Sequence, residues 1–127
     1  MFNRFVNCGI LYIYFTVQGG NIIMDFQLKP EYNSEKNCWE IAVKGEIDIY
    51  NSSNVKDYLS NIVQERPCDV YMDCSELEYI DSTGLGALVA IVKKVKNNGS
   101  NMYILNTKPN VEKVFKITNL DKVFIMK

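Results

Sequence analysis

The 127-residue sequence contains no histidine, and this absence removes several kinds of chemistry. Without an imidazole, neither a Ser-His-Asp triad nor a Cys-His pair can form, so the common activated nucleophiles are excluded. A histidine-ligated metal site and a histidine pH switch are excluded for the same reason. We therefore expect a protein that is not an enzyme, and we assign no catalytic residue, metal ligand or cofactor.

The sequence also lacks any CxxC pair among its cysteines. Its four cysteines are Cys8, Cys38, Cys68 and Cys74. Because the spacings of metal-binding and redox motifs are missing, the pattern predicts neither a metal site nor a redox site, and nothing in it argues for a disulfide. We expect reduced, partly buried thiols in a cytoplasmic protein.

Charge of one sign is not concentrated anywhere in the chain. There are 14 basic and 15 acidic residues, which give a net charge of -1, and no basic block occurs. Proteins that bind nucleic acid carry a basic patch or stripe, so we expect no nucleic-acid partner. A content of 47% hydrophobic and 23% charged residues is typical of a globular chain, and the length fits a single domain.

No hydrophobic run is long enough for a membrane helix. The longest candidate, residues 9–17, covers about nine residues where roughly 20 are needed. Only Arg4 precedes this run, and Gln18-Gly19-Gly20 matches a signal-peptide cleavage site poorly, so a secretory signal is weakly supported. We expect no stable membrane insertion.

The first 23 residues have another explanation. Gln18-Gly19-Gly20 can be encoded by CAA-GGA-GGA, a purine-rich ribosome-binding sequence, and Met24 follows after three further codons. The many Asn, Ile, Lys and Tyr residues suit an AT-rich bacterial genome. Our hypothesis is that residues 1–23 are a translated upstream region outside the fold and that the natural start is Met24. If the native chain begins at Met1, a weak membrane tether is the alternative.

From Met24 onward, short strands alternate with amphipathic helices. The expected strands cover residues 26–32, 39–43, 69–74, 102–105 and 123–126. Ser52 or Ser53 is expected to cap the first helix, Asp81-Ser82 opens the second and Pro109-Asn110 starts the third. Residues 45–48 and 75–78 are expected to be loops. The first two strands suggest a hairpin, and the later alternation implies parallel crossovers, so we predict an α/β domain.

The segment that opens the second expected helix has unusual chemistry. Asp81, Ser82 and Thr83 place a carboxylate and two hydroxyls at the helix start, and Gly84 and Gly86 follow in the first turn. Helix capping explains one of the polar residues. It does not explain the glycines, which cost about 1 kcal/mol each relative to alanine. We expect them to allow close approach of another backbone or a ligand.

Familiar catalytic and nucleotide-binding motifs do not fit this segment. A phosphate-binding loop is excluded because its lysine is missing and no basic residue follows until Lys93. A GxSxG motif is excluded because Ile80 stands two positions before Ser82. An aspartic-protease motif needs glycine two positions after the aspartate, whereas Gly84 is three after Asp81. We infer that Ser82 is acted upon rather than acting.

These residues resemble the STAS domain of bacterial anti-sigma-factor antagonists. The matching positions are Asp73, Asp81-Ser82-Thr83-Gly84-Leu85-Gly86 and, upstream, Gly45-Glu46-Ile47-Asp48. The resemblance covers Met24 to about Met126 and is tightest over residues 69–106. It implies a mixed central β-sheet with an N-terminal hairpin and amphipathic helices packed on it. Family members usually carry a further C-terminal helix, and we expect this domain, residues 24–127, to lack it.

The resemblance also implies a function. An unphosphorylated antagonist of this family binds an anti-sigma factor that is itself a serine kinase, and a sigma factor is thereby released. The kinase then inactivates the antagonist by phosphorylating the serine that follows the aspartate, here Ser82, and a serine phosphatase restores it. The implied partner-binding residues are Asp48, Asp81, Ser82, Thr83, Gly84 and Gly86.

Two alternatives stay open at the level of sequence. The chain could be a STAS scaffold subunit of a signalling or transport assembly without sigma-factor control. A small enzyme is disfavoured by the missing histidine and the missing phosphate-binding loop. Tyr50 and Tyr79 flank the segment and are further candidates for partner contact.

Overall fold

A seven-stranded sheet forms the centre of the molecule in a computed structural model that describes residues 2–7, 10–16 and 22–127, with side chains described from Phe26 onward. The strands are β1 (Phe2–Asn7), β2 (Ile10–Thr16), β3 (Ile22–Asn33), β4 (Cys38–Ile47), β5 (Asp69–Ile80), β6 (Met102–Leu105) and β7 (Ile125–Met126). The helices are α1 (Ser52–Glu65), α2 (Ser82–Asn97), α3 (Pro109–Ile117) and the short 3-10 helix η1 (Leu120–Lys122).

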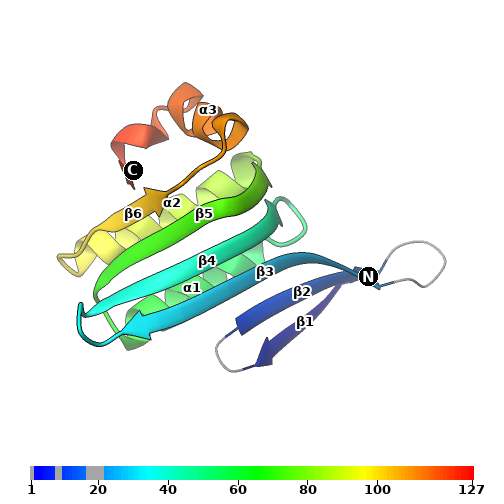
Figure 1. The fold of residues 1–127 in the computed structure, drawn as a ribbon, viewed down its shortest axis with the longest axis horizontal. Coiled ribbons are helices and arrows are strands. Elements are labelled where there is room, and N and C mark those ends of the chain that lie inside the picture. Colours follow the sequence, from blue (N-terminus) through cyan, green and yellow to red (C-terminus); the bar gives the residue numbers. More distant parts are fainter. Residues whose placement is uncertain (1, 8–9, 17–21) are drawn as a thin grey trace.

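The sheet is mixed, with strands in sequence order. Strands β1 to β4 pair antiparallel, whereas β4–β5, β5–β6 and β6–β7 pair parallel. Each parallel step needs a crossover connection, and α1, α2 and the α3–η1 segment provide the three crossovers. Helices α1 and α2 lie side by side on one face of the sheet (Figure 1). The predicted α/β domain with an opening hairpin is confirmed.

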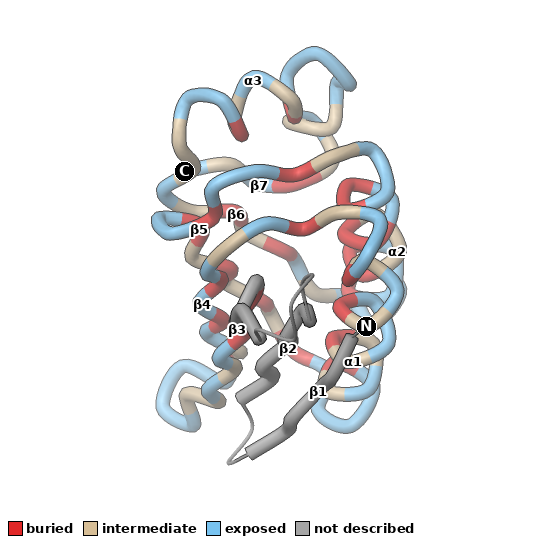
Figure 2. The backbone as a smooth tube through the Cα atoms, turned by 90° about the vertical axis from the view of Figure 1, so that its right-hand side faces the viewer, coloured by how far each residue is buried: buried red, intermediate tan, exposed pale blue. Residues whose placement is uncertain are grey.

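The hydrophobic core lies between the sheet and helices α1 and α2, where buried positions face inward from both layers (Figure 2). Helix α1 contributes Val55, Leu59 and Val63, at the spacing of one helix face. Helix α2 contributes a wider buried face, which includes Leu85, Leu88, Ile91, Val92 and Val95. This packing fixes both helices against the sheet, so the positions of their first turns are determined by the core.

Two expected loops are parts of strands. Residues 45–47 continue β4, and residues 75–78 lie inside β5, because the parallel pairing of the two strands continues to Ile47 and Ile80. The register shifts between Gly45 and Glu46, where Gly45 has a φ of 104°. Glycine adopts this conformation without steric cost, so it permits a bulge. After the bulge, the last two residues of β4 pair with the last two residues of β5. Only Asp48, from the expected upstream loop, lies beyond the strand.

The structure also differs from expectation at the N-terminus. Residues 1–23 were expected to lie outside the fold, but β1 and β2 extend the sheet from the edge of β3, with Leu11 opposite Leu28. The aromatic and β-branched residues of β2 favour strands, and the edge of β3 offers unpaired backbone groups. Met24 lies within β3. A natural start at Met24 stays a prediction.

Three of the cysteines are free and buried: Cys38, Cys68 and Cys74. Burial raises the pKa of the Cys74 thiol to about 12, so this thiol stays protonated and unreactive at neutral pH. Cys8 lies outside the described residues.

Candidate functional site

The ends of β4 and β5 bring the predicted site residues to one edge of the sheet. Ile47 and Ile80, the last residues of these parallel strands, are opposite each other. Each strand is followed by a helix on the same face, so α1 and α2 both begin at this edge (Figure 1). Asp48 follows one strand and Asp81 follows the other. Asp48 and Asp81 are therefore brought to the same end of the sheet by the parallel pairing of β4 and β5, although they are more than 30 positions apart in the sequence.

Asp81 caps helix α2, as predicted. Its Oδ1 accepts hydrogen bonds from the backbone N–H of Gly84 at 2.9 Å and from the Thr83 hydroxyl at 2.6 Å. Burial raises the pKa of Asp81, but hydrogen bonds from the Thr83 hydroxyl and from backbone N–H groups, including that of Ile49, outweigh burial and hold the pKa below its usual value. The carboxylate is therefore ionised at neutral pH and joins α2 to the turn after β4.

Gly84 and Gly86 have different environments. A Cβ atom on Gly84 would lie 2.7 Å from the carbonyl oxygen of Ile47 and 2.7 Å from Cγ1 of Ile80. The expected close approach of another backbone is confirmed at this position. No backbone approaches Gly86, where a Cβ atom would meet nothing within 4 Å, and close approach of a ligand there stays a prediction. Gly86 is exposed because it lies on the side of α2 that faces away from the sheet.

The two hydroxyls of the segment are also in different situations. Ser82 and Thr83 are both exposed on the first turn of α2. The Thr83 hydroxyl donates to the Asp81 carboxylate. Ser82 is the first residue of α2, and its side chain lies at the surface. The two hydroxyls therefore differ, because that of Thr83 is used within the helix cap.

Asp48 forms the turn between β4 and α1. Its Oδ1 accepts from the backbone N–H of Tyr50 at 2.9 Å, and its carbonyl oxygen accepts from the N–H groups of Asn51 and Ser52. The expected N-cap at Ser52 or Ser53 is wrong: the N-cap position is Asn51. The turn lies against the start of α2, because the N–H of Asp81 donates to the carbonyl oxygen of Ile47 at 3.2 Å.

Exposed apolar side chains surround the site. Ile49 is 69% exposed, Tyr50 63% and Tyr79 46%. Single exposed apolar residues are ordinary, whereas several near one another form an exposed apolar patch. The two tyrosines were predicted from sequence, whereas Ile49 was missed. A large apolar residue between Asp48 and Tyr50, in a segment expected to be a turn, was the signal that could have found it.

A shallow groove of about 300 Å³ continues the site between the first turns of α1 and α2. It is lined by Ser52, Ser53, Lys56, Thr83, Gly86, Ala87 and Ala90. The residues from α2 beyond Thr83 are glycine and alanine, so the groove is open because these side chains are small. Gly86 therefore keeps the groove open, because a larger side chain at this position would fill it.

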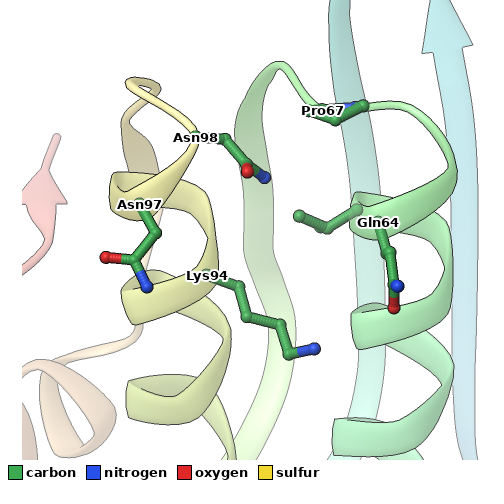
Figure 3. A pocket seen from close by; sticks show the side chains of 6 residues that line it. Gln64, Pro67, Lys94, Asn97 and Asn98 are labelled. Carbon is green, nitrogen blue, oxygen red and sulfur yellow. The ribbon is translucent and has the colours of Figure 1, made fainter.

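A second hollow, of about 230 Å³, lies at the other ends of the same helices. Figure 3 shows Lys94 reaching from α2 toward α1, with Gln64 and Pro67 opposite. Because the 16 residues of α2 span about 24 Å, this hollow is remote from Ser82. It does not belong to the candidate site.

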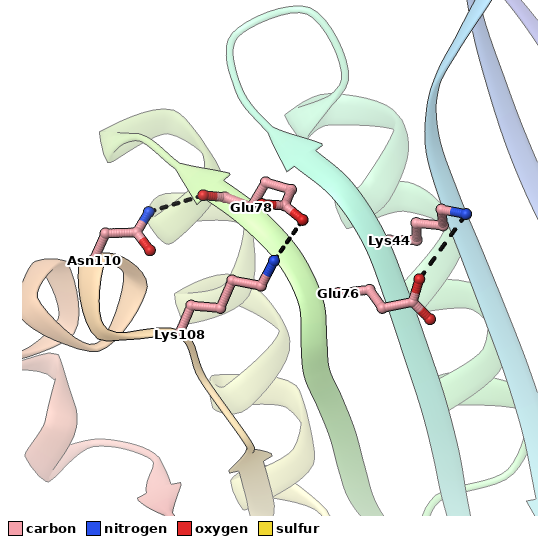
Figure 4. Close-up of polar contacts among 5 residues, drawn as sticks. All are labelled: Lys44, Glu76, Glu78, Lys108 and Asn110. Atoms are coloured by element: carbon pink, nitrogen blue, oxygen red, sulfur yellow. Dashed lines mark hydrogen bonds and ion pairs between the residues drawn. The ribbon is translucent and has the colours of Figure 1, made fainter.

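Polar contacts fasten the start of α3 beside the end of β5. Lys108 forms an ion pair with Glu78, and the Asn110 side chain donates to the Glu78 carbonyl oxygen at 2.8 Å (Figure 4). The Lys44–Glu76 pair, 3.9 Å apart, joins β4 and β5 nearby. Exposed ion pairs contribute at most about 1 kcal/mol each, so they orient these elements more than they stabilise them.

Asp73, which belongs to the matching pattern, does not join the site. It lies in the middle of β5, where its carboxylate accepts from the Ser75 N–H at 3.0 Å and from the Asn106 side chain at 3.3 Å. Burial raises the pKa of Asp73, but these hydrogen bonds outweigh burial and lower it. Asp73 connects β5 to the residue after β6, so its role is structural.

The described part of the chain contains no group of three or more Cys, Asp or Glu side chains placed to hold a metal ion. Within the same residues, no helix is long and apolar enough to cross a membrane.

Comparison with known proteins gives the family. The STAS domain matches residues 29–127, which include the paired ends of β4 and β5 and the capped start of α2. The chain belongs to the STAS-domain family. The mixed sheet with helices packed on it is the fold of this family, as the resemblance implied.

The relatives of this STAS chain include named regulators. It is 31% identical to the anti-sigma-B factor antagonist of Staphylococcus aureus (strain NCTC 8325 / PS 47) over 93 residues. This alignment covers 73% of this chain and 86% of the relative. The fold matches the unphosphorylated anti-sigma factor antagonist SpoIIAA with a TM-score of 0.67 at 20% identity, over 80% of this chain and 87% of the other. The phosphorylated form of Bacillus SpoIIAA matches with a TM-score of 0.60 at 21% identity, over 80% and 90%.

Proposed function

We propose that this STAS protein is an anti-sigma-factor antagonist. When Ser82 is unphosphorylated, it binds an anti-sigma factor that is a serine kinase, and a sigma factor is released. Phosphorylation of Ser82 inactivates it, and a serine phosphatase restores it. Relatives named anti-sigma-B factor antagonist support the first part. A protein of this fold solved in phosphorylated and unphosphorylated forms supports the second.

The exposed Ser82 hydroxyl on the first turn of α2 carries the proposal. In the transfer, the Ser82 oxygen forms a bond to the γ-phosphorus of ATP as the bond from that phosphorus to ADP breaks. The hydroxyl proton is lost to a base of the kinase. The kinase supplies the catalytic groups, and this chain supplies an accessible acceptor. We therefore propose a regulatory substrate and binding partner rather than an enzyme.

The local electrostatics favour a switch that leaves the fold intact. A phosphate on Ser82 adds a charge of about -1.5 to -2 at the start of α2. The dipole of α2 favours negative charge at this end of the helix by about 0.3–1 kcal/mol. Because the ionised Asp81 is adjacent, the surface becomes strongly negative. A partner surface that accepted a small neutral hydroxyl then meets bulk and repulsion, so binding is lost without unfolding.

The partner surface in this proposal has an apolar part and a polar part. Ile49, Tyr50 and Tyr79 supply apolar area on the sheet edge. Asp48, Asp81, Ser82, Thr83 and Gly86 supply the turns, the helix start and one side of the groove, whereas the buried Gly84 supports the helix start from beneath. Apolar and aromatic contacts provide most of the affinity at such interfaces, whereas charges mainly provide specificity.

Phosphorylation of the purified protein tests the proposal. The chain is incubated with the cognate anti-sigma kinase and ATP, and the products are mapped by mass spectrometry. One phosphate on Ser82 is expected, with none on Ser82→Ala. Ser34→Ala, which removes an exposed hydroxyl in the turn between β3 and β4, should be phosphorylated like the wild type. Association with the kinase without modification of Ser82 would contradict the proposal and favour the scaffold alternative.

A further inference from the structure

Asn51 is a buried polar residue in an unusual role. Only 3% of its surface is exposed, and it occupies the N-cap position of α1. Asparagine at an N-cap ordinarily accepts a hydrogen bond from the first turn of its helix. The Asn51 side chain makes no such bond. Its hydrogen-bonding capacity is used elsewhere.

The side chain is turned back toward the end of β4. Its Oδ1 accepts from the backbone N–H of Asp48 at 2.9 Å, and its Nδ2 donates to the carbonyl oxygen of Glu46 at 2.7 Å. A buried amide must satisfy both its acceptor and its donor, and here both are satisfied by one short stretch of backbone. Asn51 therefore holds residues 46–48 to the start of α1.

The other side of the same turn is held by α2. The Asp81 N–H donates to the carbonyl oxygen of Ile47 at 3.2 Å, and the backbone N–H of Ile49 helps to lower the pKa of the Asp81 carboxylate. Ile49 thus projects into solvent, 69% exposed, from a turn whose backbone is fixed by Asn51 on one side and by Asp81 on the other. A side chain in a fixed turn loses little conformational freedom on binding, which strengthens association.

We infer that Asn51 is a positioning residue for partner recognition: it holds the turn that presents Ile49 beside Ser82, and it does so without touching the partner. The role of the turn in binding rests on the proposed function. The hold of Asn51 on the turn rests only on the contacts of this chain. The two parts can therefore be measured separately.

The substitution Asn51→Asp tests the role. Aspartate has the same size and is an equally favourable N-cap residue, so α1 keeps its start. It still accepts from Asp48, but it places a second oxygen against the Glu46 carbonyl in place of the N–H donor. Asn61→Asp is the matched control because it makes the same change at an exposed position of α1. Asn51→Ser, which removes both contacts, is the second variant, and circular dichroism shows whether each variant is folded.

The first measurement needs no partner. Amide hydrogen exchange at Asp48 and Ile49 should be about tenfold faster in Asn51→Asp than in Asn61→Asp if the turn opens tenfold more often. Exchange in β5 and β6, which reports global unfolding, should stay much slower than exchange at Asp48 and Ile49 in both variants, so that the opening measured at the turn is local. Equal exchange at Asp48 and Ile49 in both variants would overturn the role of Asn51.

The second measurement uses the anti-sigma kinase. If the turn adopts the binding conformation about a tenth as often, affinity falls about tenfold in Asn51→Asp and is unchanged in Asn61→Asp. In the phosphorylation of Ser82, the KM for the protein should rise while kcat is unchanged, because docking and not chemistry is affected. Faster exchange with unchanged affinity would overturn the positioning role. If the wild-type chain binds no anti-sigma kinase, the proposed function fails, and the exchange measurement still decides whether Asn51 holds the turn.

Discussion

A Cβ atom on Gly84 would lie 2.7 Å from the carbonyl oxygen of Ile47, the same oxygen that accepts a hydrogen bond from the N–H of Asp81. The end of β4 is therefore in contact with the first turn of α2 through backbone atoms on both sides. Gly86, two residues further along α2, has open space instead. Two glycines that look equivalent in the sequence thus have different physical roles.

The first prediction concerns the stability of these two positions. Gly84→Ala should lower the free energy of unfolding by about 1–3 kcal/mol, because backbone atoms of β4 must shift to admit the methyl group. Gly86→Ala should raise it by about 0.5–1 kcal/mol, because alanine favours the helix and meets nothing. Urea unfolding of the two variants beside the wild type measures both changes. The same sign of change in both variants would contradict the conclusion that Gly84 is crowded by β4 and that Gly86 has open space.

The second prediction is that Asp81 makes the free energy of unfolding depend on pH in the acid range. Its pKa is lowered in the folded state, so its stabilising effect is full above the unfolded value of about 3.9 and is lost as the pH falls through the lower folded value. Asp81→Asn keeps an N-cap acceptor but removes the negative charge at the helix start, so it should cost about 0.3–1 kcal/mol at pH 7 and less at pH 2. Urea unfolding from pH 7 to pH 2 measures this difference.

Asp57→Asn is the control for the acid experiment. Asp57 is exposed on α1, so its substitution should leave the pH dependence of the wild type unchanged. Part of the acid sensitivity should survive in Asp81→Asn, because the pKa of Asp73 is also lowered. A pH profile of Asp81→Asn that is parallel to that of the wild type would show that the Asp81 contacts are not made.

The third prediction separates binding from stability at the exposed isoleucines. Ile49→Ser should change the free energy of unfolding by no more than about 0.5 kcal/mol, because the side chain is 69% exposed. It should weaken binding to the anti-sigma kinase by more than about 1 kcal/mol, roughly fivefold or more, as a contact residue does. Titration calorimetry with the kinase measures the affinity.

Ile117 provides the comparison for Ile49. It is 70% exposed but lies on the last turn of α3, away from the start of α2. Ile117→Ser makes the same chemical change and should leave the affinity as it is in the wild type. An equal loss of affinity in both variants would show that general surface hydrophobicity, and not the edge beside Ser82, determines binding.

Several features could be predicted from the sequence because they depend on local patterns. The period of apolar residues placed α1, α2 and the opening hairpin, and the Asp-Ser-Thr string placed the start of α2 at Asp81. The exposure of Ser82 follows from the same pattern. The strand continuation through residues 75–78 was missed because Glu76 and Glu78 face solvent and hide the pairing of β5 with β4.

Other features depend on contacts between distant segments and leave little trace in the sequence. The difference between Gly84 and Gly86 appears only when the end of β4 is placed against α2. The same is true of Asn51, whose sequence context suggests an ordinary helix start near Ser52. The pairing of β2 with the edge of β3 also joins separate segments, and the interpretation of residues 1–23 as a translated upstream region rested on their possible codons and not on this edge.

The affinity of the anti-sigma kinase for Ser82 variants tests the central claim most directly. Ser82→Ala should bind as the unphosphorylated wild type does, because the partner accepts a small neutral side chain. Ser82→Asp and the phosphorylated wild type should bind more than about 100-fold more weakly, because a like charge at the interface costs several kcal/mol. Circular dichroism should show all forms equally folded. Equal affinities for Ser82→Ala and Ser82→Asp would contradict the account.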